Sequence, residues 1–218
     1  MILDHAEVET PEGARIRQRL EKVPAPKCVL VEPIPEKLAV GENHFKLNGM
    51  KGTFLLAFVG RQSGQLANFE DWGGSRPDIP MVSVDGQIKT LDLSRVDILH
   101  ADVQGAESEM LIGAEQALRE HHIGYLFIST HGCEHRRCLS RLVRHGYKII
   151  AEHSVLESVS GDGLIVARAP EYPGPDQIEI SKRKPGHLAL MRYHLSSLRR
   201  RFGELLSESL SKARLTRA

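Results

Sequence analysis

The sequence predicts an α/β fold built on a mostly parallel sheet, followed by a C-terminal amphipathic helix. Short apolar runs of strand length alternate with amphipathic segments of helical length, the pattern of repeated βα units. The runs are continuously apolar, as expected for strands covered on both faces. The last two runs, 147–153 and 163–170, leave no room for a helix between them, so we expect them to pair antiparallel.

The first elements alternate helix and strand. A helix at 14–23 is ended by the prolines that follow it. A continuous apolar strand at 28–31 stops at a Glu-Pro pair. Pro35 can begin the next helix, because its fixed φ suits the first helical turn, and Asn-Gly at 48–49 ends it. A second apolar strand follows at 53–60.

A long loop is predicted next, over Arg61–Pro80, because this segment is rich in Gly and Pro and holds the single Trp of the chain, Trp72. Loops of this length inside compact domains are usually functional or disordered. The segment 81–86 is predicted as a short strand or edge segment, and 90–94 as a turn or the beginning of a helix. In the helix predicted to begin at Pro35, the residues predicted to be buried are Leu38, Phe45 and Leu47.

Two further strand and helix pairs complete the predicted sheet. The strands are expected at 97–103 and 124–130, and the helices at 107–121 and 137–146. One face of the helix at 107–121 is apolar at three-and-four spacing, which predicts that this face is buried. The residues of that face are Met110, Leu111, Ala114 and Leu118.

We expect a domain at 1–170, a linker at 171–184 and a basic tail at 185–218. The segment from Ser181 onward carries a net charge of +8, although the whole chain carries only +1. The tail has apolar residues at helical spacing opposite a basic face, which predicts an amphipathic helix. Such a helix could dock on the domain, form a homo-oligomer, or make peripheral membrane contact through its arginines. Nucleic-acid binding is not expected, because few aromatic residues interleave with the basic ones.

Composition favours a cytoplasmic protein. Of 218 residues, 41% are hydrophobic and 26% charged, values ordinary for a globular protein. No apolar run approaches the length needed to cross a bilayer, and the start MILDHAEVET does not resemble a secretory signal. Three cysteines predict reduced thiols rather than a disulfide framework.

Acidic residues at strand ends are the first candidates for chemistry, because ligands of open α/β sheets bind at the carboxyl ends of the strands. Glu32 ends the first clear strand, where an acid commonly binds the hydroxyls of an adenosine ribose; a plain turn residue is the alternative. Asp102 ends the strand at 97–103, where it could instead cap the following helix. Glu107 could simply complement the dipole of that helix.

Five segments of the chain form a recognisable series of motifs: LVEPIPEKL, ENHFKLNGM, IKTLDLSRVDILHADVQGAESEML, YLFISTHG and GDGLIVARA. Their order resembles that of the FkbM-type S-adenosylmethionine-dependent methyltransferases, and DVQGAE is the most specific of the motifs. The resemblance covers about Cys28 to Ala169. It implies a Rossmann-like methyltransferase fold, S-adenosylmethionine as cofactor, and methyl transfer to a hydroxyl of a sugar or small metabolite.

The resemblance also implies roles for particular residues. Glu32 would hold the cofactor ribose, and Asp102 would lie at the floor of the cofactor and acceptor cleft, where it positions the acceptor. His131 follows the strand at 124–130 and could be the general base, since its unperturbed pKa lies near neutrality; a surface turn histidine is the alternative. Glu107 and Trp72 are expected on the acceptor side, Trp72 as a lid or as a simple anchoring aromatic.

The chain departs from the family pattern at its start. The first strand should end in an acid followed by a glycine-rich turn, and only MILDHAEVETPEG is found there, which leaves a truncated or degenerate first strand. Asp4 stands close to where that acid belongs and is the candidate for the methionine part of the cofactor. Two functions remain open on this ground: an O-methyltransferase, or a catalytically inactive methyltransferase-like module that serves binding and assembly.

A metal site is not predicted. The segment HGCEHRRC holds ligand types at His131, Cys133, His135 and Cys138, but it lacks the two separated pairs of a structural zinc site. We expect instead a loop that leads into a helix, with Cys138 packed inward.

Overall fold

The computed structural model describes residues 26–71 and 74–184. The chain forms two compact units, unit 1 within Met1–Phe58 and Ala67–Pro80, and unit 2 within Val59–Leu66 and Met81–Ala218. The predicted helices at 14–23 and in the tail, as well as Asp4 and Trp72, lie outside the described residues. The elements are mixed α/β, with both parallel and antiparallel strand pairs.

Unit 1 contains a parallel βαβ arrangement. Strand β1 (Cys28–Glu32) pairs with β2 (Gly52–Leu56), and helix α3 (Pro35–Leu47) connects them. The predicted helix boundaries are confirmed: Pro35 occupies the first turn, and Gly49 follows the end of the helix with a φ of 62°. Leu38 is buried as predicted. Leu47 is 74% exposed, so its predicted burial is wrong, because it lies in the last turn and faces away from the sheet.

The predicted loop over Arg61–Pro80 is wrong, because most of this segment forms two strands. Strand β4 (Leu66–Asp71) and strand β5 (Gly74–Val82) are neighbours in a sheet whose third strand is β3 (Phe58–Val59). With only two residues, β3 pairs with a small part of β5. The rest of β5 is an edge on that side, where the prolines at 77 and 80 can be accommodated.

The segment 81–86, predicted as a short strand or edge segment, is strand only at Met81 and Val82, and a short helix, α4 (Val84–Thr90), follows. Its N-cap is Ser83, whose hydroxyl accepts a hydrogen bond from the Gly86 N–H at 3.1 Å. This helix was not predicted from the sequence, because Gly86 and the β-branched residues at its two ends, Val84 and Thr90, have low helix propensity.

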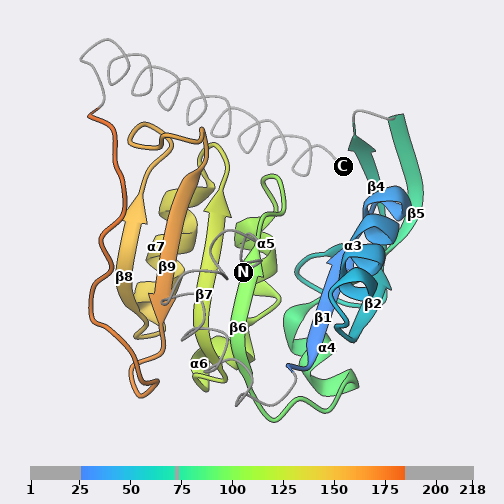
Figure 1. Cartoon of the computed structure of the whole chain (residues 1–218), viewed down its shortest axis with the longest axis horizontal. Helices are drawn as coiled ribbons and strands as arrows, with labels where there is room; N and C mark the ends of the chain where they lie inside the picture. The colour runs from blue at the N-terminus through green and yellow to red at the C-terminus, as the bar shows by residue number, and fades with distance from the viewer. Residues whose placement is uncertain (1–25, 72–73, 185–218) are drawn as a thin grey trace, which may run out of the picture. The chain divides into compact units, whose positions relative to one another are not determined.

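Unit 2 has one sheet in the order β6-β7-β9-β8, with α5 and α7 on one face (Figure 1). Strands β6 and β7 are parallel, whereas β9 is antiparallel to both β7 and β8, so the predicted antiparallel pairing at the C-terminal end is confirmed. The bounds are β6 (Val96–Ala101), α5 (Glu107–Ile112), α6 (Glu115–Arg119), β7 (Ile123–Thr130), α7 (Glu134–Arg144), β8 (Lys148–His153) and β9 (Gly163–Arg168).

The helix predicted at 107–121 is interrupted at Gly113, which separates α5 from α6. A Cβ at Gly113 would lie 2.2 Å from the backbone oxygen of Gly60, so only glycine permits this close approach. The first turn of helix α6 is capped by a side chain of helix α4. Both carboxylate oxygens of Asp85 accept backbone hydrogen bonds at 2.9 Å, from Gln116 and Ala117.

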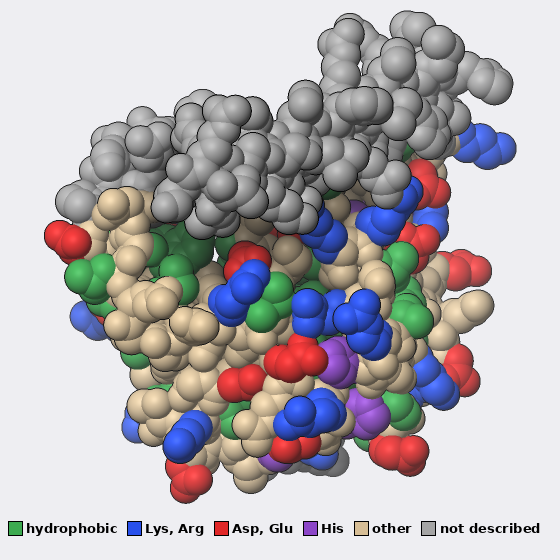
Figure 2. Space-filling view, turned by 180° about the vertical axis from the view of Figure 1, so that it is seen from behind, with side chains coloured by type: hydrophobic (Ala, Val, Ile, Leu, Met, Phe, Trp, Pro, Cys, Tyr) green, Lys and Arg blue, Asp and Glu red, His purple; other side chains and the backbone are tan. Residues whose placement is uncertain are grey.

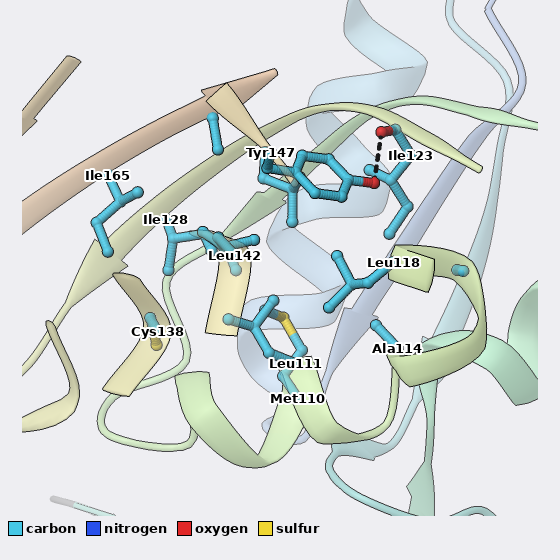
Figure 3. Close-up of a cluster of buried hydrophobic side chains, with 14 of the residues drawn as sticks. Met110, Leu111, Ala114, Leu118, Ile123, Ile128, Cys138, Leu142, Tyr147 and Ile165 are labelled. Atoms are coloured by element: carbon cyan, nitrogen blue, oxygen red, sulfur yellow. Dashed lines mark hydrogen bonds between the residues drawn. The ribbon is translucent and has the colours of Figure 1, made fainter. Parts of the chain in front are cut away.

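The core of unit 2 lies between the sheet and these helices (Figure 3). Met110, Leu111, Ala114 and Leu118 are buried there, as their spacing predicted. Cys138 is also fully buried, and burial raises the pKa of its thiol to about 12, with Glu107 and Glu134 adding to the effect.

Surface charge on the helix side of the molecule is mixed. Figure 2 shows Lys and Arg side chains interspersed with Asp and Glu on the described part of this face. On the helices of unit 2, Arg141 pairs with Glu115, and Arg137 pairs with the buried Glu134. None of the helices in the described part of the chain is long and apolar enough to cross a bilayer.

Residues 171–184, predicted as a linker, are attached to unit 2. The Ile178 N–H donates to the Ile150 oxygen at 2.9 Å, along the outer edge of β8. At the other end of this segment, the Tyr172 hydroxyl donates to Asp97 at 2.7 Å, which lowers the pKa of Asp97. The Tyr172 ring lies over Gly124, where a Cβ would meet the ring at 2.5 Å.

We predict that Gly124→Ala destabilises unit 2 by about 1–3 kcal/mol, because the methyl group cannot fit against the Tyr172 ring. The double variant Gly124→Ala/Tyr172→Ala removes the ring and should lose less than the sum of the two single variants. Chemical denaturation of all four proteins measures this coupling. Strictly additive losses would show that the Tyr172 ring does not occupy this position.

Candidate functional site

The candidate site lies at the carboxyl ends of β6 and β7. These strands are parallel, with Ala101 opposite Ile128, so the residues that follow each strand emerge at the same edge of the sheet. Asp102 follows β6 directly, and His131 follows β7 directly. Both are predicted site residues, and the structure brings their side chains together: His131 Nε2 is 3.4 Å from Asp102 Oδ1.

The strongest contact of the site joins His131 to Glu107. His131 Nδ1 is 2.6 Å from Glu107 Oε1, and the same oxygen accepts a hydrogen bond from the Gly105 N–H at 3.0 Å. Because an ionised carboxylate can only accept, Nδ1 carries a proton in this contact, and in the neutral ring Nε2 is then the acceptor. Glu107 thereby fixes both the orientation and the tautomer of the ring.

Glu107 is fully buried, although it was expected on the acceptor side. It is the first residue of α5, where the helix dipole favours a negative charge. Its Oε2 is buried and has no hydrogen-bond partner among the described residues, so its charge is only partly compensated. This residual charge favours any positive charge that develops on the neighbouring His131 ring.

The turn between β6 and α5 explains the DVQGAE spacing. Gln104 and Gly105 have positive φ angles of 50° and 97°, so the backbone reverses between the strand and the helix. The Gln104 amide donates to Asp102 Oδ1 at 3.0 Å and holds that carboxylate. The alternative role of Asp102 as a helix cap is not observed, since Ala106 is the N-cap of α5 and no side chain caps it.

A third carboxylate, Asp162, completes the surroundings of His131. Its Oδ1 lies 3.4 Å from His131 Nε2. The pairing of β7 with β9 causes this approach, because Thr130 is opposite Gly163 and the next residues outward are His131 and Asp162. Asp162 was not among the predicted site residues. The available signal was the Asp-Gly pair before the last strand, which was noted only as part of the family pattern.

Behind the site, a hydrogen-bonded relay joins the buried Thr130 and His135 to the partly exposed Glu152. The Thr130 hydroxyl is 2.9 Å from His135 Nδ1, and His135 Nε2 is 3.0 Å from Glu152 Oε2. A Cβ at Gly163 would lie 2.3 Å from the Thr130 hydroxyl, so glycine is required beside this relay. His135 thus has a structural role in this relay. Cys138 is buried in the core, as expected. Within the described residues, no group of three or more His, Cys, Asp or Glu side chains is arranged to hold a metal ion.

Glu32, the candidate for the cofactor ribose, belongs to unit 1, whereas Asp102, Glu107 and His131 belong to unit 2. Within unit 1, Glu32 is the last residue of β1 and is partly buried. Its Oε1 accepts a hydrogen bond from the Ile34 N–H at 2.9 Å, which fixes the carboxylate at the strand end. Asp4 and Trp72 lie outside the described residues, so their proposed contacts remain predictions.

The sequence matches the family described as the methyltransferase FkbM domain over residues 11–149. The chain belongs to this family. The match includes β1, β6, β7 and the DVQGAE turn, and it ends before β9, which contributes Asp162 through its preceding loop. No curated protein and no solved structure matches the chain significantly. Membership identifies the FkbM domain of this protein as a methyltransferase domain and leaves its acceptor to be inferred from the site.

We predict that Glu107 controls the tautomer of His131. In Glu107→Ala the ring loses the acceptor for Nδ1–H, so nitrogen-15 NMR of labelled histidine should show Nε2–H becoming populated. The free energy of unfolding should fall by about 3 kcal/mol or more. Glu107→Gln retains one oxygen acceptor, so it should keep the Nδ1–H tautomer and lose about 1–3 kcal/mol.

Glu109→Gln is the matched control, because Glu109 is on the same helix but pairs with Arg61 at the surface. Its effect on stability should stay within about 0.5 kcal/mol, and the His131 signals should not move. An unchanged His131 tautomer in Glu107→Ala would contradict the assignment.

Proposed function

We propose that this FkbM-domain protein is an S-adenosylmethionine-dependent O-methyltransferase that acts on a hydroxyl of a sugar or small metabolite. The observation that carries the proposal is the 2.6 Å contact between Glu107 and His131 Nδ1. It leaves His131 Nε2 as a base beside two exposed carboxylates, which is the group needed to take a proton from a hydroxyl. Family membership supplies the reaction class.

The described residues of unit 1 fit one part of the cofactor. Glu32 offers a carboxylate that only accepts hydrogen bonds, held at the carboxyl end of a parallel strand, where the two hydroxyls of a ribose can donate to it. When bound, S-adenosylmethionine would supply a methyl group carried on a positively charged sulfur. Asp4 is the proposed partner of the methionine part of the cofactor.

His131 and its neighbours would perform the acid–base part of the reaction. Nε2 would take the proton that the acceptor hydroxyl loses on methylation, and the ring would become positively charged. The buried Glu107 would stabilise that charge through Nδ1–H, since electrostatic attraction is strong where water is excluded. Asp102 would orient the acceptor by accepting a hydrogen bond from it, because its carboxylate is half-exposed next to Nε2.

We predict that isothermal titration calorimetry detects binding of S-adenosylhomocysteine and that Glu32→Ala weakens it roughly 10- to 100-fold, through loss of hydrogen bonds to a charged group. Glu42→Ala, an exposed carboxylate on α3 of the same unit, is the control and should bind normally. No heat and no thermal shift at millimolar ligand would exclude the proposed enzyme. That outcome would favour the alternative, an inactive methyltransferase-like module.

We further predict that His131→Gln lowers kcat by about 10²- to 10⁴-fold and leaves the Kd for S-adenosylhomocysteine unchanged. The assay measures S-adenosylhomocysteine release with a panel of methyl glycopyranosides as acceptors. His122→Gln is the control, since His122 precedes β7 at the opposite end of that strand. A His131→Gln rate within threefold of the unmodified protein would show that this ring is not the base.

A further inference from the structure

Three hydrogen-bond acceptors converge on one point of the candidate site. With the proton of His131 on Nδ1, its Nε2 presents a lone pair, and the Oδ1 atoms of Asp102 and Asp162 each lie 3.4 Å from it. A separation of 3.4 Å is longer than a good hydrogen bond, and acceptors do not attract one another. In the neutral ring none of the three atoms can donate to the others, so a donor from a bound molecule would complete the arrangement.

Local hydrogen bonds hold the Asp102 carboxylate and the loop backbone that precedes Asp162. Asp102 receives the Gln104 amide at 3.0 Å. Asp162 ends a loop built on the fully buried Ser158, whose hydroxyl oxygen accepts from the N–H groups of Ser160 and Gly161 at 3.0 and 2.9 Å. The side chains of Asp102 and Asp162 nevertheless remain 47% exposed, so a molecule from solution can reach both.

The negative charge of Asp102 and Asp162 determines which kind of molecule can bind beside His131. Two exposed carboxylates repel a carboxylate or phosphate group and accept hydrogen bonds from hydroxyls. Neighbouring hydroxyl oxygens of a sugar ring are about 3 Å apart, a spacing similar to the distance from Nε2 to either carboxylate oxygen. One hydroxyl can thus donate to Nε2 while the next one donates to a carboxylate.

We propose that Asp162 is an acceptor-binding residue and that, with Asp102, it selects an uncharged acceptor that carries neighbouring hydroxyls. The inference rests on the proposed function, because it takes the hydroxyl beside Nε2 as the one that is methylated. Asp102 and Asp162 flank Nε2, so one of them binds the hydroxyl next to the reacting one. An acceptor with an anionic group beside these hydroxyls is rejected.

The test uses pairs of probes that differ only in charge: the methyl α-pyranosides of glucose, galactose and mannose, and the corresponding methyl uronosides. Binding is followed with EDTA present by the NMR signals of the His131 ring in histidine-labelled protein. We expect at least one neutral glycoside to shift these signals and to bind about tenfold or more tightly than its uronoside. Binding of S-adenosylhomocysteine is measured separately by calorimetry.

Variants at Asp162 distinguish a role in acceptor binding from a purely structural role. Asp162→Ala should weaken the neutral glycoside roughly 10- to 100-fold. Asp162→Asn keeps the shape of the side chain and removes its charge. The ratio of the uronoside Kd to the neutral glycoside Kd should therefore fall toward one. A purely structural role would not change this ratio. Glu171→Gln removes an exposed charge beyond the far end of β9 and should leave both affinities unchanged.

Each other result overturns the proposal. Equal or tighter binding of the uronosides, an unchanged preference in Asp162→Asn, or no shift of the His131 signals by any neutral glycoside would exclude acceptor binding by Asp162. Binding that requires added Mg²⁺ would assign the carboxylates to a cation instead. Failure of S-adenosylhomocysteine to bind would reject the methyltransferase, whereas an Asp162-dependent His131 shift by a neutral glycoside would still establish the hydroxyl-binding site.

Discussion

The candidate site depends on a carboxylate that is buried beside a histidine. Placing Glu107 out of water is costly unless its oxygens find donors, and the chain provides two for Oε1, the Gly105 N–H and His131 Nδ1–H. The first donor, the Gly105 N–H, belongs to the DVQGAE turn, in which Gln104 and Gly105 have positive φ angles. The second donor needs β7 beside β6, in parallel register. The hydrogen bonds of Glu107 therefore require both the local turn after β6 and the long-range pairing of β6 with β7.

The sequence could predict those parts of the fold that local pattern determines. Continuous apolar runs predicted β1, β6, β7 and β9, and helical spacing predicted the buried face of α5 and α6. The errors lie where tertiary structure overrides propensity. The prolines at 77 and 80 disfavour a strand in the sequence, yet they lie in β5, of which the two-residue β3 can pair with only a small part. Gly113, which follows α5, must be glycine because the backbone oxygen of Gly60 lies against it, a contact between residues far apart in the sequence.

The same division holds for the site. Asp102 and His131 were predicted from residue type and position after a strand, since the carboxyl edge of a parallel sheet is predictable, and Glu107 was predicted from the family resemblance. Their division of roles was not, because burial separates two carboxylates that look alike in the sequence: Glu107 is fully buried and Asp102 is half-exposed. Asp162 was missed because its approach to His131 follows from the antiparallel register of β7 and β9, in which Thr130 is opposite Gly163. No spacing along the chain encodes that register.

Burial also explains why three carboxylates around one histidine need not compete for it. The attraction between Glu107 and the ring acts in a water-poor interior, where it is only weakly screened, so this contact is the persistent one. Asp102 and Asp162 face solvent and are screened by water and salt, so their contacts with Nε2 are weak and exchange readily for contacts with a bound hydroxyl. One side of the imidazole is thus fixed and the other side is available. A base needs this asymmetry, since a ring held equally on both sides would have no free lone pair to offer.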